Sequence, residues 1–303
     1  MSTEITTPPA EAASRATPRT ACAAVAALRP RQWTKNLLLF GGILFGAQFG
    51  DGTRWLQALV AFAAYCLASS AAYLVNDIRD AAADRLHPRK RRRPVARGDL
   101  APRTAVALAA AAAVAALALA AVIGRESLGL LIAFLALQGA YTLALKAIVL
   151  LDILAIAGLF VLRAAAGAVA VDVPSSSWLL ICTAFLALFL VLAKRRAELR
   201  LVATAETPGR AVLADYPVAL VDQLVSVAAA SAVISYSLYT FTAHDSDAMM
   251  LTIPFVLYGV FRYLLLVEGS RGEEPEDVLL NDPPLLLAIA LWAAVAAAIL
   301  VAE

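Results

Sequence analysis

The stretch NDIRDAAADRLHPRKRRRPVARG, residues 76–98, places regularly spaced acidic residues and then a dense block of bases between two apolar segments. Asn76, Asp80 and Asp84 are four residues apart, and Asp77 lies three residues before Asp80. On an α-helix of about 3.6 residues per turn, these four side chains share one face. The pattern therefore predicts a helix with a row of oxygen ligands along one side.

Carboxylates spaced in this way repel one another unless a cation lies among them. Carboxylate and carboxamide oxygens suit a hard cation such as Mg²⁺, which can in turn hold a diphosphate through its oxygens. We therefore expect a Mg²⁺ site. Its predicted ligands are Asn76, Asp77, Asp80 and Asp84.

The basic run complements the acids. Lys90, Arg91 and Arg93 can contact phosphate oxygens that a metal leaves uncovered, with arginine able to do so through two hydrogen bonds. Pro88 and Pro94 indicate that the helix has ended, so the bases lie on a loop that can fold over a ligand. The alternative is a solvated positive anchor at the membrane edge, but this alternative does not explain the regular acids.

Composition sets the class of protein. Of 303 residues, 62% are hydrophobic and 16% charged, and the mean hydropathy is +0.78. These values exclude an ordinary soluble domain. We expect an all-α integral membrane protein. Its expected partners include the lipid bilayer and no nucleic acid. Three scattered cysteines are too few for a disulfide framework or a thiolate metal site.

Nine apolar segments are candidates for spanning helices of about 20 residues. They are residues 37–50, 55–75, 103–123, 127–145, 149–170, 177–193, 220–243, 249–267 and 284–302. Residues 1–21, rich in Thr, Ala and Pro, are expected to form a disordered tail. Residues 22–303 would form one membrane domain, in which the tryptophan and bases of 22–36 predict an interfacial helix.

The connections predict the orientation, because Lys and Arg concentrate in cytoplasmic loops. Residues 76–102 and 194–219 carry most of the bases, whereas 50–53, 124–127, 172–177 and 244–247 carry few. We expect a multi-pass protein of the cell membrane with its N-terminus inside and its C-terminus outside. The acidic row would face the cytoplasm.

Further charges lie in or near the predicted spans. Lys146 and Asp152 flank the turn between the fourth and fifth spans, and Arg163 lies near the middle of the fifth. An arginine facing lipid there costs several kcal/mol. We find no acid at similar depth, so a bound phosphate is the expected partner, with a structural ion pair as the alternative.

Two more sets of bases are candidates for phosphate contacts. Lys194 and Arg195 leave the sixth span together, although for Arg195 a membrane-anchoring role fits equally well. Arg262 is near the end of the eighth span and is followed by an acidic stretch, residues 268–282, which we expect to be a solvated loop.

NDIRDAAAD at 76–84, with its basic loop and nine predicted helices, resembles the UbiA-type membrane prenyltransferases over nearly everything after the tail. RPRQWTKNLLLF, HPRKRRRPVARG, YTLALKAIVLLDILAIAGLFVLRAAAGA, KRRAEL and PFVLYGVFRYLLL resemble its decaprenyl-phosphate phosphoribosyltransferase branch. Ordinary members carry a second, DxxxD-type motif after the sixth helix, which KRRAELRLVATAETPGRAVLAD lacks. This departure suits a donor with an additional phosphate.

The resemblance implies a UbiA-type bundle that transfers a 5-phosphoribosyl group from phosphoribosyl pyrophosphate to decaprenyl, or another polyprenyl, phosphate. This reaction supplies precursors of cell-wall arabinan, with Mg²⁺ as cofactor. A trimer is implied by resemblance only. Catalytic roles fall to Asp77, Asp80, Asp84 and Lys90. Expected substrate contacts are Lys35, Asn76, Lys90, Arg91, Arg93, Tyr141, Lys146, Arg163, Lys194, Arg195 and Arg262.

Two other functions stay open at this point. The first is UbiA-type transfer of a prenyl chain from its diphosphate to a small polar or aromatic acceptor. The second is a non-catalytic transporter or flippase of lipid phosphates. A transporter predicts charges along a path through both leaflets, whereas the charges of this sequence gather on one predicted face.

Overall fold

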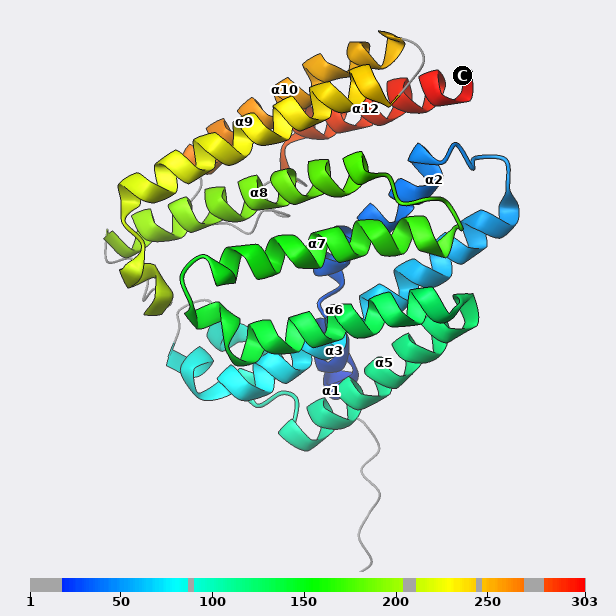
Figure 1. Cartoon of the computed structure of the whole chain (residues 1–303). Coiled ribbons are helices and arrows are strands. Elements are labelled where there is room, and N and C mark those ends of the chain that lie inside the picture. The colour runs from blue at the N-terminus through cyan, green and yellow to red at the C-terminus, as the bar shows by residue number, and fades with distance from the viewer. Residues whose placement is uncertain (1–17, 87–89, 204–210, 244–246, 270–280, 303) are drawn as a thin grey trace, which may run out of the picture.

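The computed structural model describes residues 18–86, 90–203, 211–243, 247–269 and 281–302. All regular structure in these ranges is helical, which confirms the all-α class. The long helices lie side by side, and the chain reverses direction from each to the next (Figure 1). Most helices pack against their neighbours in sequence, and α3 packs extensively against α5.

Eight helices in the described ranges are long and apolar enough to cross a membrane, so the chain is a multi-pass membrane protein. They correspond to the last eight predicted segments. The elements are α3 Gly52–Leu86, α5 Pro102–Ile123, α6 Arg125–Leu143, α7 Leu151–Ala170, α8 Ser177–Ala203, α9 Val218–Thr242, η5 Asp247–Thr252 with α10 Ile253–Gly269, and α12 Pro283–Ala302. The predicted count of nine is not confirmed.

The N-terminal segment differs from the prediction. In place of one helix over 22–36 and a span over 37–50, there are α1 Pro18–Leu28, the 3₁₀ helix η1 Pro30–Phe40 and α2 Gly41–Phe45. The break falls at Arg29, whose φ is 55°, because Pro30 lacks an N–H and disfavours a helical residue before it. Residues 18–21 of the expected tail belong to α1, and residues 1–17 lie outside the described ranges.

The segment 30–45 still connects the two ends of the bundle. At its start, Arg29 contacts Asp77 near the end of α3. After its end, Gly46 lies against Val173, which follows α7 at the opposite end. A 3₁₀ helix rises about 2.0 Å per residue and an α-helix about 1.5 Å, so η1 and α2 together extend about 30 Å, comparable with the hydrocarbon core of a bilayer.

Helix α3 is the longest, with 35 residues, and it carries the acidic row in its last turns. Alanine and arginine between the acids favour helix. Alanines of α5 are buried at intervals of three or four residues; such small side chains let two helices approach closely. We call the end of the bundle at which α3, α6, α8 and α10 finish the charged end (left in Figure 1).

Candidate functional site

The four predicted metal ligands of α3 divide into two pairs at the charged end. Asn76 and Asp80, one helical turn apart, face Lys146 in the short turn η3, Leu145–Ala147. Lys146 Nζ lies 3.5 Å from Asn76 Oδ1 and 3.2 Å from Asp80 Oδ2. Two of the four predicted ligands on α3 are thus brought together with Lys146, a predicted phosphate contact that follows α6.

The other pair, Asp77 and Asp84, faces two arginines and is buried, at 1% and 3% exposure. Arg29 Nη2 lies 2.5 Å from Asp77 Oδ1. Arg93 Nη1 bridges the pair, at 3.2 Å from Asp77 Oδ1 and 2.7 Å from Asp84 Oδ2. Arg93 can reach back because η2, Lys90–Arg92, and α4, Pro94–Arg97, fold beside α3.

The donor chemistry of this row fits a hard cation. Asp77 Oδ2 is buried and has no hydrogen-bond partner, and leaving a buried carboxylate oxygen without a partner is costly. Across the described residues, however, no three His, Cys, Asp or Glu side chains are close enough to hold a metal ion. In this arrangement Lys146 engages one pair, and Arg29 and Arg93 engage the other.

Two arginines of the site were not predicted as site residues. Arg29, treated above only as part of the interfacial helix, pairs with Asp77 and lies 4.9 Å from the centroid of the Tyr73 ring. Arg79, inside the acidic row, donates to the carbonyls of Thr142 and Leu143 at the end of α6. For Arg29, the proline that follows it could have indicated the helix break at which its side chain turns toward α3. For Arg79, no pattern in the sequence indicates which residues it contacts.

The remaining predicted residues near the row vary in their contacts. Lys35 lies on η1, where its Nζ is 2.6 Å from Gln32 Oε1. Lys90 is half-buried and Arg91 exposed in η2. Tyr141 is half-buried near the end of α6, one turn before Lys146. Residues 87–89, including the predicted helix break at Pro88, lie outside the described ranges.

Arg163 lies apart from the acidic row. It is 4% exposed, and its Nε donates to Asn36 Oδ1 at 2.8 Å. Asn36 in turn contacts α3 at Cys66, 11 residues before Asp77. Eleven residues of α-helix correspond to about 16 Å. The structure therefore places Arg163 more than one helical turn deeper than the predicted metal ligands.

Arg195 is paired inside the protein rather than presented to a ligand. Its Nε lies 2.9 Å from Asp152 Oδ2 and its Nη1 2.6 Å from Glu198 Oε2, and it is 1% exposed. Tyr216 donates to Asp152 Oδ1 at 2.6 Å. Burial, together with this hydrogen bond, raises the pKa of Tyr216 to about 12.

This buried group also orders the turn before α7. The Tyr216 hydroxyl accepts a hydrogen bond from the backbone N–H of Leu150 at 2.7 Å. Leu150 has a φ of 67°, a strained value for a branched residue that its surroundings must hold. The turn that contains Lys146 is thereby fixed next to the acidic row. Lys194, half-buried on α8, directly precedes Arg195.

A second set of ion pairs joins α8, α9 and α10. Arg196 pairs with Asp222 and Glu268, and Arg200 also pairs with Glu268. Arg262, predicted to contact substrate, binds Asp282 before α12 through Nη2 at 2.8 Å. Of the expected acidic loop, residues 270–280 lie outside the described ranges.

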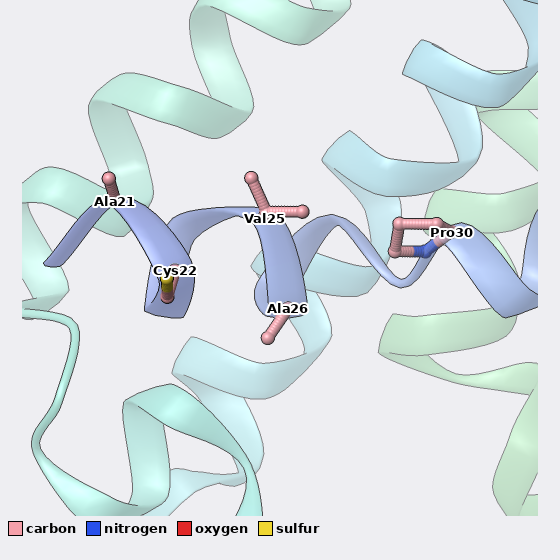
Figure 2. Close-up of a pocket in the computed structure, with 5 residues that line it drawn as sticks. All are labelled: Ala21, Cys22, Val25, Ala26 and Pro30. Carbon is pink, nitrogen blue, oxygen red and sulfur yellow. The ribbon is translucent and has the colours of Figure 1, made fainter. Parts of the chain in front are cut away.

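An apolar hollow of about 410 Å³ lies on the outer side of α1, lined by Ala21, Cys22, Val25, Ala26 and Pro30 (Figure 2). Figure 2 shows four of these side chains on α1 and Pro30 at the start of η1, with no charged group among them. The hollow offers no acid, base or phosphate ligand, so we do not place chemistry there.

Residues 36–282 match the sequence pattern of the UbiA prenyltransferase family. The chain belongs to the UbiA prenyltransferase family. A relative from Mycobacterium tuberculosis, strain CDC 1551, is named decaprenyl-phosphate phosphoribosyltransferase. It is 35% identical over 91% of this chain and 93% of its own length. A relative of the same name from Corynebacterium glutamicum is 35% identical over 88% of this chain and 83% of its own length.

Among solved structures, a UbiA homologue from Archaeoglobus fulgidus bound to GPP and Mg²⁺ matches with a TM-score of 0.70. The match covers 93% of this chain and all of that chain at 19% identity. At this identity the likeness establishes the UbiA fold. The UbiA-type bundle expected from the acidic motif is thereby confirmed.

Proposed function

We propose that this UbiA-family protein is an enzyme that transfers the 5-phosphoribosyl group of phosphoribosyl pyrophosphate to decaprenyl or another polyprenyl phosphate, releasing pyrophosphate. One observation carries the proposal: the oxygen-rich row of α3 meets cations from three separate segments, Arg29, Arg93 and Lys146. Such an arrangement suits a polyanionic donor. The names of the relatives that are 35% identical supply the substrate class.

The proposed cofactor is Mg²⁺, held by Asn76, Asp77, Asp80 and Asp84. When bound, the ion supplies Lewis-acid neutralisation of a departing pyrophosphate. Lys90, Arg93 and Lys146 would contact pyrophosphate oxygens and stabilise the negative charge that grows there. To do so, Arg93 and Lys146 exchange their present carboxylate partners for phosphate oxygens.

The acceptor needs little help from the protein to become a nucleophile. A phosphate monoester is already anionic near neutral pH, so we assign no general base. The ribose passes through a transition state of oxocarbenium character as its bond to pyrophosphate breaks. We assign Lys35 and Lys194 to the second phosphate, either the 5-phosphate of the donor or the phosphate of the acceptor. The polyprenyl chain would lie along apolar helix surface open to the bilayer.

We further propose that the charged end faces the cytoplasm of a cell membrane. The bases gather at this end, as the positive-inside rule predicts for cytoplasmic segments. Among the described residues, only Arg54 and Arg125 are bases near the opposite end. The water-soluble, highly charged donor would then reach the acidic row without crossing the bilayer.

The test is a two-substrate assay on the purified protein in lipid nanodiscs. Radiolabelled phosphoribosyl pyrophosphate and decaprenyl phosphate should give a labelled lipid in the presence of Mg²⁺, and EDTA should abolish the product. Asp80→Asn should lose the activity, whereas Asp99→Asn, on the adjacent exposed loop, is the matched control. No labelled lipid from the wild-type protein with Mg²⁺ would reject the proposal.

The family description favours one alternative, prenyl transfer from a prenyl diphosphate to a small acceptor. The same preparation distinguishes the two reactions when it is given labelled prenyl diphosphate and a panel of aromatic and polar acceptors. Prenylated product without phosphoribosyl transfer would establish the alternative.

A further inference from the structure

The helix η1 has an unusual form that needs an explanation. It continues as a 3₁₀ helix for 11 residues, whereas runs longer than about three or four residues are uncommon because the hydrogen-bond geometry is poorer than in an α-helix. Its sequence, PRQWTKNLLLF, has no glycine and only one proline, at its first position. Contacts from other helices must therefore stabilise this form.

The 3₁₀ winding has a consequence for the site. Residues three apart are in register on a 3₁₀ helix, so Gln32 and Lys35 form one row, and Arg29 directly precedes the helix with a left-handed backbone. This row lies beside the site: Gln32 accepts from the Tyr73 hydroxyl on α3 and from Lys35, and the preceding Arg29 contacts Asp77. In an α-helix, each step of three residues would rotate the side chain by about 60° away from the row.

A second row of η1 faces α3 and α7. Trp33 Nε1 donates to Ser70 Oγ at 3.1 Å, and Asn36 Nδ2 lies 3.3 Å from Cys66 Sγ. Asn36 is fully buried, and its carboxamide oxygen accepts from Arg163 Nε at 2.8 Å. One carboxamide thus links η1 to both α3 and α7.

Arg163 is buried without a carboxylate partner in the part of the chain that the structure describes. Its Nη1 donates to the Leu159 carbonyl of its own helix at 3.0 Å. Its guanidinium lies 4.6 Å and 5.3 Å from the ring centroids of Phe134 and Phe160. Two aromatic faces and two neutral oxygens therefore take the place of water around the cation.

We propose that Arg163 is a positioning residue: through Asn36 it holds η1 in the 3₁₀ form that aligns Gln32 and Lys35, next to Arg29, toward the acidic row. This role replaces the phosphate contact that the sequence suggested for Arg163. The inference rests on the proposed function, because only a bound phosphate substrate makes the alignment of the row useful. Both the depth of Arg163 and its existing partners favour it over a direct phosphate contact.

The decisive variant is Asn36→Asp, because the two roles predict opposite results. A carboxylate in place of the carboxamide still accepts the hydrogen bond from Arg163 Nε, and its negative charge also neutralises the guanidinium. A positioning role therefore predicts a KM for phosphoribosyl pyrophosphate within about threefold of wild type and an unchanged or higher Tm. If Arg163 binds a substrate phosphate, the added carboxylate repels that phosphate, and a KM raised by more than about tenfold would overturn the proposal.

Asn36→Leu tests the same link by removing the acceptor. The positioning role predicts that kcat/KM falls at least about tenfold, and that Arg163→Leu adds little to this loss in the double variant. Additive losses in the double variant would contradict it. Thr34→Val is the matched control, because Thr34 lies on the outward row of η1 and its hydroxyl donates to the Arg31 carbonyl of the same helix; its kinetics should equal wild type.

A readout independent of activity separates this inference from the proposed function. Cys66 is buried against Asn36, so its alkylation rate reports whether η1 stays in place. In a Cys22→Ser/Cys182→Ser background, alkylation should be slow with or without the Asn36→Asp change. It should be at least about tenfold faster after Asn36→Leu or Arg163→Leu. Equal rates in all four proteins would reject the positioning role even if no phosphoribosyl transfer is found.

Discussion

The acidic row of α3 and the arginines of α8 lie at the same end of the bundle, but their partners come from different kinds of structure. In the α8 region, Arg195 pairs with Asp152 and Arg196 with Asp222, and each pair joins two long helices. In the acidic row, the cations Arg29, Arg93 and Lys146 come from short connecting segments.

This difference distinguishes structural ion pairs from groups available to a ligand. Asp152 has both carboxylate oxygens engaged, one by Arg195 and one by Tyr216. Asp77, equally buried, keeps Oδ2 without a partner. Short segments can shift when a ligand takes over one of their ion pairs, whereas packed helices shift little. We therefore assign chemistry to the first region and cohesion of the bundle to the second.

The largest expected effect is on activity in the acidic row. Asp77→Asn and Asp80→Asn should each lower kcat by at least about 100-fold, because each removes a charge that interacts with the leaving group only through the bound cofactor. The Tm in detergent should change little for Asp80→Asn, which is half-exposed. Turnover measured on labelled lipid product checks this, and full activity in either variant would remove the acidic row from the site.

The α8 region should respond in stability instead. Arg195→Met leaves Asp152 buried without its cation, which costs about 3–5 kcal/mol, whereas Arg195→Met with Asp152→Leu should recover most of that loss. Unfolding titrations of the single and double variants measure both values. The corresponding double change in the acidic row, Arg93→Met with Asp84→Leu, should not restore activity. If the Arg93→Met/Asp84→Leu variant recovered turnover, the acidic row would have a structural role like that of the α8 region.

A smaller effect, on both stability and activity, is expected where Leu39 of η1 packs against Gly167 of α7. A Cβ added to Gly167 would lie 2.7 Å from Leu39 Cα, so Gly167→Ala should destabilise the protein by about 1–3 kcal/mol through overpacking. It should also lower kcat/KM, because η1 carries Lys35 and directly follows Arg29. Gly139→Ala on α6, which has open space around the added Cβ, is the matched control and should leave both Tm and kcat/KM near wild type.

The smallest expected effect is a pH dependence of the Tm at the Arg262–Asp282 pair, before α12. The hydrogen bond from Arg262 holds the pKa of the Asp282 carboxyl below its usual range. A depressed folded-state pKa stabilises the protein fully above the unfolded value of about 3.9 and loses this effect as pH falls through the folded value. The Tm difference between wild type and Asp282→Asn should therefore shrink below about pH 4. A difference that stays constant down to pH 3 would contradict this assignment.

Local patterns in the sequence predicted much of the molecule. The apolar segments correspond to the eight long helices to within a few residues at most ends, although α3 and α8 extend further at the charged end. The four-residue spacing placed Asn76 and Asp80 on one side of α3, and the charge asymmetry marked one end of the bundle. These features are local, because hydrophobic length and helical period depend only on neighbours along the chain.

Only the tertiary structure decided which charge meets which. Arg29 and Asp77 are 48 residues apart in sequence, and Arg163 and Asn36 are 127 apart. The burial of Arg195 against Asp152, the division of the acids into two pairs and the 3₁₀ winding of η1 all depend on such contacts. Composition and periodicity specify which residues enter a helix and which face they share. The partner of a buried charge is set by how the helices pack, because only packing brings distant residues within hydrogen-bond distance.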